Sequence, residues 1–426
     1  MRRRLIGFTI AVVVVVAVCV GFDDAQAELC AIDNVPAATL LIPHFRVDLS
    51  RCGKSKGENT LFTVLNTHAA PTTAHVTVWT DLSVPTFSLN VNLPGYGVQR
   101  FNLKTLFCEG TITGNAAGVN TPVDSDTLNS YQRWHQGKRS GLTGNCASTR
   151  RRSSDIAIGY VTVDNVQAPV SGNPSDGAFY LDHLSNTNQL IGHVYHRTYE
   201  QATKTEVVST PVTAPKIPTK KNCSLKSDPQ KRAACKERRK LLKRLLPLEP
   251  KVKLVDKTYQ KSQGLRGYPA VHIEAHDSFS GGGSGAKTFY GRYVAGGTDN
   301  REPLPTTFAV EYGQSRANHQ YDLIVWREGG PEAAPVNCGT DPDWYPLGLT
   351  QAVAFDSNSN ATEIFPTFAA ETQIYSDFLS EVPYNSEWVY LNFNTGAGIS
   401  QAWAIQRRDG TFDGEGVVPF NSACES

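Results

Sequence analysis

His272, Glu274 and His276 alternate with apolar residues. This alternation predicts a strand on which all three side chains share one face. Neighbours two apart lie about 6.8 Å apart from Cα to Cα, so two of them can chelate one metal ion, whereas the outer pair at about 13 Å cannot join easily. A zinc-type site would therefore take its third ligand from His193 or His196. The alternative is the polar face of a half-exposed strand.

Two loop segments resemble ligand-binding motifs only in part. Gly281 to Thr288 has the look of a phosphate-binding loop, but the motif requires glycine where Ala286 stands, and a strand-like run rather than a helix follows. Asp409 to Gly416 departs from the 12-residue calcium loop and is typical of a hairpin turn. We therefore assign no catalytic residue and no cofactor.

The segment from Lys216 to Lys261 carries 16 Lys or Arg residues against four acidic ones in a chain of net charge +1. Ser227 is a predicted N-cap, and Gln230 to Leu246 lacks helix breakers, which indicates a basic amphipathic helix. Its charge predicts contact with an anionic polysaccharide or lipid surface, without specific nucleic-acid recognition. The alternative is a solvated insertion whose leucine stripe packs on its own β domain. The candidate contact residues are Lys231, Arg232, Lys236, Arg238, Arg239, Lys240, Lys243 and Arg244.

The N-terminus has the pattern of an export signal. Arg2 to Arg4 precede an apolar run from Leu5 to Val20, and Ala25-Gln26-Ala27 offers a cleavage site. We expect cleavage after Ala27 and a mature chain that is secreted or held at the cell surface or in the periplasm. No later segment is long and apolar enough to span a bilayer.

Eight of the nine cysteines remain after cleavage of the signal, and an even number in an exported chain predicts disulfides. Sequence cannot choose among the 105 possible connectivities. Zinc-thiolate binding is the competing use, but no Cys-x-x-Cys is present. We predict sequential pairing: Cys30–Cys52, Cys108–Cys146, Cys223–Cys235 and Cys338–Cys424.

Short β-type runs bounded by turn residues recur along the chain. Those from Leu61 to Leu103 predict an antiparallel meander, and Phe308 precedes Trp326 at nearly the spacing that separates Phe62 from Trp79. This similarity favours two related β domains. The four strand tryptophans are either a carbohydrate-stacking platform or packing residues: Trp79, Trp326, Trp388 and Trp403.

The predicted fold is all-β, with two antiparallel Ig-like β-sandwich domains and a basic α-helical insertion between them. The expected boundaries follow the composition of the chain. They are a signal peptide at 1–27, an N-terminal sandwich at 28–205, the insertion at 206–264 and a C-terminal sandwich at 265–426.

Several spaced segments resemble a family of uncharacterised exported bacterial β-rich proteins. They include Leu40 to Phe45, Asn300 to Pro305, Ile324 to Arg327 and Trp388 to Phe393. That family has no assigned activity, so the resemblance implies no catalytic residue. The leading functional hypothesis is an exported structural or binding protein that contacts anionic envelope polymers. The alternative is an exported hydrolase, metal-dependent through His272 and His276, that acts on carbohydrate or peptide.

Overall fold

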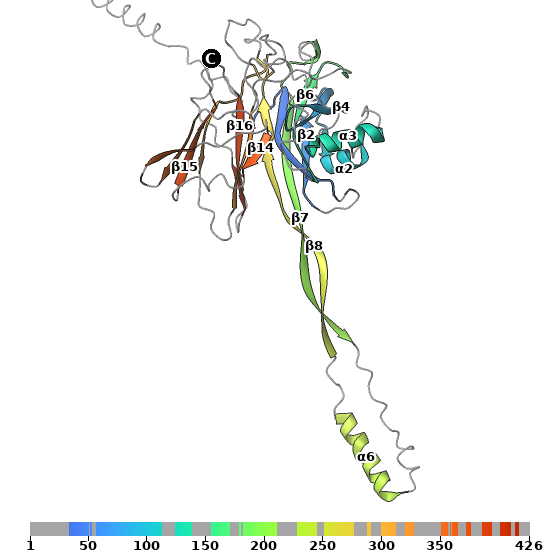
Figure 1. Cartoon of the computed structure of the whole chain (residues 1–426). Helices are drawn as coiled ribbons and strands as arrows, with labels where there is room; N and C mark the ends of the chain where they lie inside the picture. Colours follow the sequence, from blue (N-terminus) through green and yellow to red (C-terminus); the bar gives the residue numbers. More distant parts are fainter. Residues whose placement is uncertain are drawn as a thin grey trace, which may run out of the picture. The chain divides into compact units, whose positions relative to one another are not determined.

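The computed structural model is mostly β, with several antiparallel sheets and short helices (Figure 1). Among the described residues, no helix is both long and apolar enough to cross a membrane. The predicted signal peptide lies outside these residues. The structure describes residues 34–50, 52, 57–112, 124–138, 155–170, 179, 182–210, 228–244, 251–276, 288–290, 300–311, 320–327, 351–356, 358, 360–364, 372–375, 386–393, 401–409 and 414–416.

The first sheet has the strand order β4-β3-β6-β1-β9 and is antiparallel throughout. β1 lies between β6 and β9, although sequence patterns did not single it out as a strand. Pro43 lies within β1, at a register shift between Ile42 and Phe45. Proline has no N–H to donate, so a sheet tolerates it mainly at a bulge or an edge, and this irregularity is such a place. The strands are β1 (Thr39–Asp48), β3 (Thr72–Thr80), β4 (Pro85–Leu93), β6 (Ile156–Val166) and β9 (Val271–Ile273).

The second sheet has the order β5-β2-β7-β8, and Figure 1 shows β7 and β8 running side by side. Phe62 of β2 stacks on Phe101 of β5 with ring centroids 4.4 Å apart, and both rings are buried. β7 and β8 are far longer than a typical strand of about 5–6 residues. The strands are β2 (Asn59–Asn66), β5 (Val98–Asn102), β7 (Leu190–Thr210) and β8 (Lys251–Pro269).

The predicted meander from Leu61 to Leu103 is wrong in its pairing. β3 pairs with β4 in the first sheet, whereas β2 pairs with β5 in the second. The four strands form one long hairpin that bends from one sheet into the other. Asn66, fully buried, fastens this bend by donating its side-chain amide to the carbonyl oxygens of Ala70 and Pro94. Gly95 is required there, since an added Cβ would lie 1.9 Å from the Ala69 carbonyl oxygen.

Two further sheets are built only from the C-terminal part of the chain, in the orders β10-β15-β12-β13 and β14-β11-β16-β17. The predicted strands around Phe308, Trp326, Trp388 and Trp403 are confirmed. The strands are β10 (Thr307–Glu311), β11 (Gln320–Arg327), β12 (Gln351–Asp356), β13 (Ala361–Ile364), β14 (Thr372–Tyr375), β15 (Ser386–Asn392), β16 (Ala402–Asp409) and β17 (Gly414–Gly416).

Two short helices, α2 (Leu103–Glu109) and α3 (Ser125–His135), lie beside each other in Figure 1. The Asn102 and Asp124 side chains cap them by accepting hydrogen bonds from first-turn backbone N–H groups. Neither helix was predicted.

The chain divides into two compact units. The first unit consists of Met1–Thr198 and Gly264–Ser426, and the second consists of Tyr199–Gln263. The first unit therefore contains strands from both predicted β domains, and the boundaries at 205 and 265 stay a prediction. Within this unit, Tyr160 lies edge-on to Trp326 with ring centroids 5.8 Å apart. The Thr372 hydroxyl also donates to the Pro43 carbonyl oxygen at 2.6 Å. The second unit contains α6 (Pro229–Arg244) and parts of β7 and β8, so the predicted helical insertion also carries strands.

The tryptophans do not form a stacking platform. Trp79, Trp326 and Trp403 are buried, and only Trp388 of the four is exposed. Trp79 stacks on Tyr160 and donates its indole N–H to the Thr162 hydroxyl at 2.9 Å. These three side chains are core packing residues, which is a common role of large aromatic groups.

Candidate functional site

A buried carboxylate lies at the centre of a polar network in the first sheet. Asp164 of β6 is opposite Thr39 of β1, and the Thr39 hydroxyl donates to Asp164 Oδ1 at 2.6 Å. The Tyr290 hydroxyl lies 2.9 Å from each carboxylate oxygen and donates to them. Asp164 is 1% exposed and Tyr290 is also 1% exposed. Hydrogen bonds therefore replace water around this carboxylate, as a buried polar group requires.

Arg301 completes the network from a distant part of the sequence, and its side chain is fully buried. Its Nε donates to Thr39 Oγ1 at 2.8 Å, so the Thr39 hydroxyl links the guanidinium to Asp164. Its two terminal nitrogens donate to Asn186 Oδ1 and to the Ser185 carbonyl oxygen, each at 3.0 Å. The Arg301 guanidinium thus links β1, which contains Thr39, to the segment that follows β6.

Burial decides the ionisation of this network. Desolvation raises the pKa of Asp164 above its ordinary value of 3.8, while Arg301 and the hydrogen bonds from Thr39 and Tyr290 act in the opposite direction. Burial and the nearby Asp164 carboxylate raise the pKa of Tyr290 well above 10.0. Tyr290 therefore acts as a hydrogen-bond donor at neutral pH. The arrangement holds charge inside the protein and has the character of a structural network.

The raised pKa of Asp164 predicts a pH-dependent stability. A carboxyl group with a raised folded-state pKa contributes stability that is fully present below its unfolded value, here about 3.8, and is lost as pH rises through the folded value. The stability of the wild type relative to Asp164→Asn should therefore fall as pH rises above about 4. Urea unfolding of both proteins over a pH series measures this difference.

Asp124→Asn is the matched control, because backbone and side-chain hydrogen bonds from Thr127 lower the pKa of that exposed carboxyl group. Its contribution is present above 3.8 and is lost as pH falls, which is the opposite trend. If the stability of the wild type relative to Asp164→Asn rose with pH, this would contradict the inferred direction.

The structure does not gather the candidate metal ligands on one strand face. Strand β9 ends at Ile273, so His272 and His276 do not belong to one strand. His272 is buried, and its Nε2 lies 3.2 Å from the backbone N of Gly192, which donates to it. His276 Nε2 instead lies 3.7 Å from Glu302 Oε2. The pairing of this segment with β1 ends at Ile273, and Ala275 instead forms an antiparallel bridge with Arg301.

The structure also describes the two candidate third ligands, His193 and His196. His193 is exposed, and His196 meets the Thr60 hydroxyl at Nδ1 and the Tyr268 hydroxyl at Nε2. Within the described ranges, no group of three or more His, Cys, Asp or Glu side chains has an arrangement that could hold a metal ion. A metal site at His272, Glu274 and His276 therefore receives no support from the described geometry.

Glu302 is a buried residue that sequence patterns did not single out. Its Oε1 accepts the backbone N–H of Glu274 at 2.9 Å, and its own backbone N–H donates to the Glu274 carbonyl oxygen. Asn188 donates its side-chain amide to Glu274 Oε2 at 3.3 Å. The only signal in the sequence is an Arg-Glu pair, Arg301-Glu302, before Pro303. Both members of this pair are buried.

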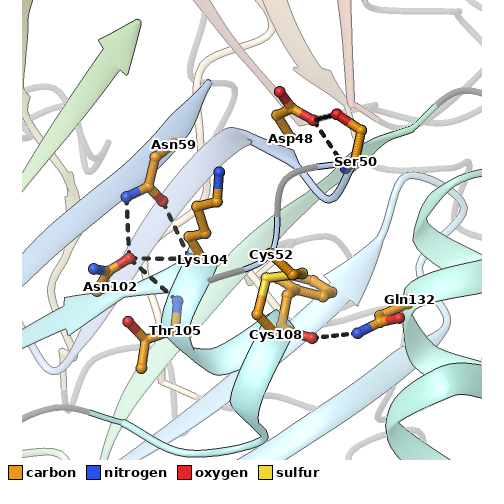
Figure 2. Close-up of a disulfide and its surroundings, with 10 residues drawn as sticks. Asp48, Ser50, Cys52, Asn59, Asn102, Lys104, Thr105, Cys108 and Gln132 are labelled. Atoms are coloured by element: carbon orange, nitrogen blue, oxygen red, sulfur yellow. Dashed lines mark hydrogen bonds between the residues drawn. A yellow bond between two sulfur atoms is a disulfide. The ribbon is translucent and has the colours of Figure 1, made fainter. Parts of the chain in front are cut away.

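A disulfide joins Cys52 to Cys108, with the two Cα atoms 5.4 Å apart (Figure 2). Cys108 lies on α2, whose N-cap Asn102 also accepts a hydrogen bond from Asn59. Gln132 of α3 donates to the Phe107 carbonyl oxygen at 2.6 Å, next to the disulfide. The bond therefore fixes α2 to the connection between β1 and β2.

The predicted pairings Cys30–Cys52 and Cys108–Cys146 are wrong, because each of these bonds would need a cysteine already used in Cys52–Cys108. Proximity along the chain does not determine which Cα atoms come within bonding reach. Here β2 pairs with β5, which leads directly into α2. Cys235 is disulfide-bonded to a cysteine outside the described residues, so Cys223–Cys235 stays a prediction, as does Cys338–Cys424.

The predicted basic helix is confirmed as α6, from Pro229 to Arg244. Its cap is Asp228 and not Ser227, because Asp228 Oδ1 accepts the backbone N–H groups of Gln230 and Lys231 at 2.8 and 3.4 Å. A helix of this length is marginal in water on its own. The cap at Asp228 therefore helps to keep this segment helical.

Five of the candidate contact residues are exposed, Arg239 is half-buried, and nothing is described of the side chains of Lys243 and Arg244. Ala234, on the face with the predicted leucine stripe, is also exposed. Lys231 approaches Asp228 at 3.9 Å, an exposed contact that contributes little. The exposed candidates are Lys231, Arg232, Lys236, Arg238 and Lys240.

No protein-family model, curated protein or solved structure matches the chain. The resemblance to exported bacterial β-rich proteins therefore stays a prediction. The two features that bear on function are the buried charge network in the first unit and the basic helix α6 in the second.

Proposed function

We propose that the protein is an exported structural or binding protein of the cell surface or extracellular space that contacts anionic envelope polymers through α6. One observation carries the proposal: α6 exposes five basic side chains from a single short helix, in a chain whose net charge is only +1. A concentration of like charge attracts polyanions largely independently of their sequence, by release of counterions. The described disulfides suit an oxidising compartment.

The two-sandwich arrangement belongs to the same proposal. All strands of two sheets come from residues 307–416, while the other two sheets are built from residues 39–273. This separation supports one sandwich for each part of the chain. The Asp164–Arg301 network would then hold the N-terminal sandwich to the segment that leads into the C-terminal one.

A linker replacement tests the proposal. Exchange of residues 211–250 for a short Gly-Ser linker removes α6 and leaves the bounds of β7 and β8 intact. We expect the mature protein to co-sediment with polygalacturonate or with phosphatidylglycerol vesicles, and the linker variant to lose this binding at least tenfold, since the charge that attracts the polyanion is gone.

Neutral dextran and phosphatidylcholine vesicles are the controls and should bind neither protein. Thermal unfolding of the linker variant checks that its β sheets remain folded. Equal binding by the mature protein and the linker variant would refute the role of α6. Absence of binding by both proteins would refute the proposal as a whole.

A further inference from the structure

The basic residues of α6 are not distributed evenly around the helix. Arg232, Lys236, Arg239 and Lys243 follow the spacing i, i+4, i+7, i+11. At 3.6 residues per turn these four positions fall within an arc of about 60°, along about 16 Å of the helix axis. We call this set the basic row. Glu237, the only acidic residue within α6, lies about 130° away from it.

The basic row is unfavourable in the free helix. Like charges at i, i+3 and i+4 repel each other and destabilise a helix. Arg232 and Lys236 are exposed, so water and salt weaken this repulsion but do not remove it. An anionic partner that lies along the row would offset this repulsion, because it attracts each of the four cations.

The arrangement of the basic row favours a linear anionic polymer over a lipid surface as its partner. A membrane-surface helix needs a broad apolar face that enters the lipid. α6 contains no aromatic residue, and its only large aliphatic residues are Leu241 and Leu242, which are adjacent and so do not face the same direction. A straight row of cations instead matches a polymer that carries anionic groups at regular intervals.

We infer that the basic row of α6 binds a linear anionic polysaccharide lengthwise. This inference rests on the proposed function and adds the partner class and the residues that recognise it. Arginine and lysine differ in their use there, because the planar Arg232 and Arg239 guanidinium groups can bind a carboxylate or sulfate group with two hydrogen bonds, whereas Lys236 and Lys243 act as point charges.

Two variants of equal charge test the inference. The row variant carries R232Q, K236Q, R239Q and K243Q, and the matched control carries K231Q, R238Q, K240Q and R244Q, which remove four charges from other faces. Glutamine keeps a helix propensity close to that of arginine and lysine, and circular dichroism confirms that α6 persists. The probe is polygalacturonate, with phosphatidylglycerol vesicles as the second arm, and the full mature protein is used.

We expect the row variant to bind polygalacturonate at least tenfold more weakly than the control variant. Four contacts also predict that the slope of log affinity against log salt becomes shallower by about 3 in the row variant. Equal losses in both variants, or no loss in either, would overturn the inference, as would tighter binding to vesicles than to polygalacturonate at matched anionic charge. The linker variant separates this failure from failure of the proposed function, since its loss of binding shows that α6 carries the contact even when the row does not.

Discussion

Arg301→Met should destabilise the protein by about 3–5 kcal/mol, the cost of removing one partner from a buried charged network. The methionine roughly fills the volume of the arginine stem but leaves the Asp164 carboxylate buried without its cation. Thr39 Oγ1, Asn186 Oδ1 and the Ser185 carbonyl oxygen would each lose a donor. Urea unfolding at neutral pH, followed by tryptophan fluorescence, measures the change.

Arg46→Met is the matched control. Arg46 also pairs with a carboxylate, that of Glu58, but their side chains are 30% and 33% exposed. A pair in contact with water contributes about 0–1 kcal/mol. Asp164→Asn in the Arg301→Met background should recover part of the loss, because the uncompensated charge is removed. An Arg301→Met variant no less stable than Arg46→Met would show that the network carries little of the folding energy.

Removal of the Cys52–Cys108 disulfide should destabilise the first unit by about 4 kcal/mol. The bond spans a sequence separation of 56, and a loop of that size restricts the unfolded chain strongly. The double variant C52S/C108S avoids a free thiol at either position. Its free energy of unfolding, compared with that of the wild type under non-reducing conditions, gives the effect.

Cys235→Ser is the control, since Cys235 belongs to the other unit, Tyr199–Gln263. It should leave the unfolding of the first unit nearly unchanged. Peptide mapping without reduction should also recover Cys52 linked to Cys108. Recovery of Cys52 with Cys30 would contradict the structure and favour sequential pairing.

Sequence patterns predicted those strands and helices whose formation depends mainly on neighbouring residues in the chain. Short β-type runs bounded by turn residues located β3, β4, β11 and β15, because strand preference depends on residue types that are adjacent in the chain. The run without breakers after Asp228 located α6. β1 was missed because Pro43 interrupts its pattern, and only the bulge beside it shows how a sheet accepts that residue.

The first-sheet network lies beyond such patterns. Thr39, Asp164, Tyr290 and Arg301 come from four separate segments, and no spacing in the sequence relates them. Only the pairing of β1 with β6 sets Thr39 opposite Asp164, and only the return of the chain after β9 brings Arg301 to them. A buried charge is recognised by its partners, which are chosen by the tertiary fold.

The sequence by itself therefore determined the β character of the chain and the concentration of positive charge on one helix. These properties depend on composition and on the periods of strand and helix, which are local. The tertiary structure decided that the hairpin from β2 to β5 bends between two sheets, that Cys52 joins Cys108, and that His272 and His276 contact different partners. Each of these outcomes depends on contacts between distant segments, whose free energy is set by what packs together and not by what is adjacent in the chain.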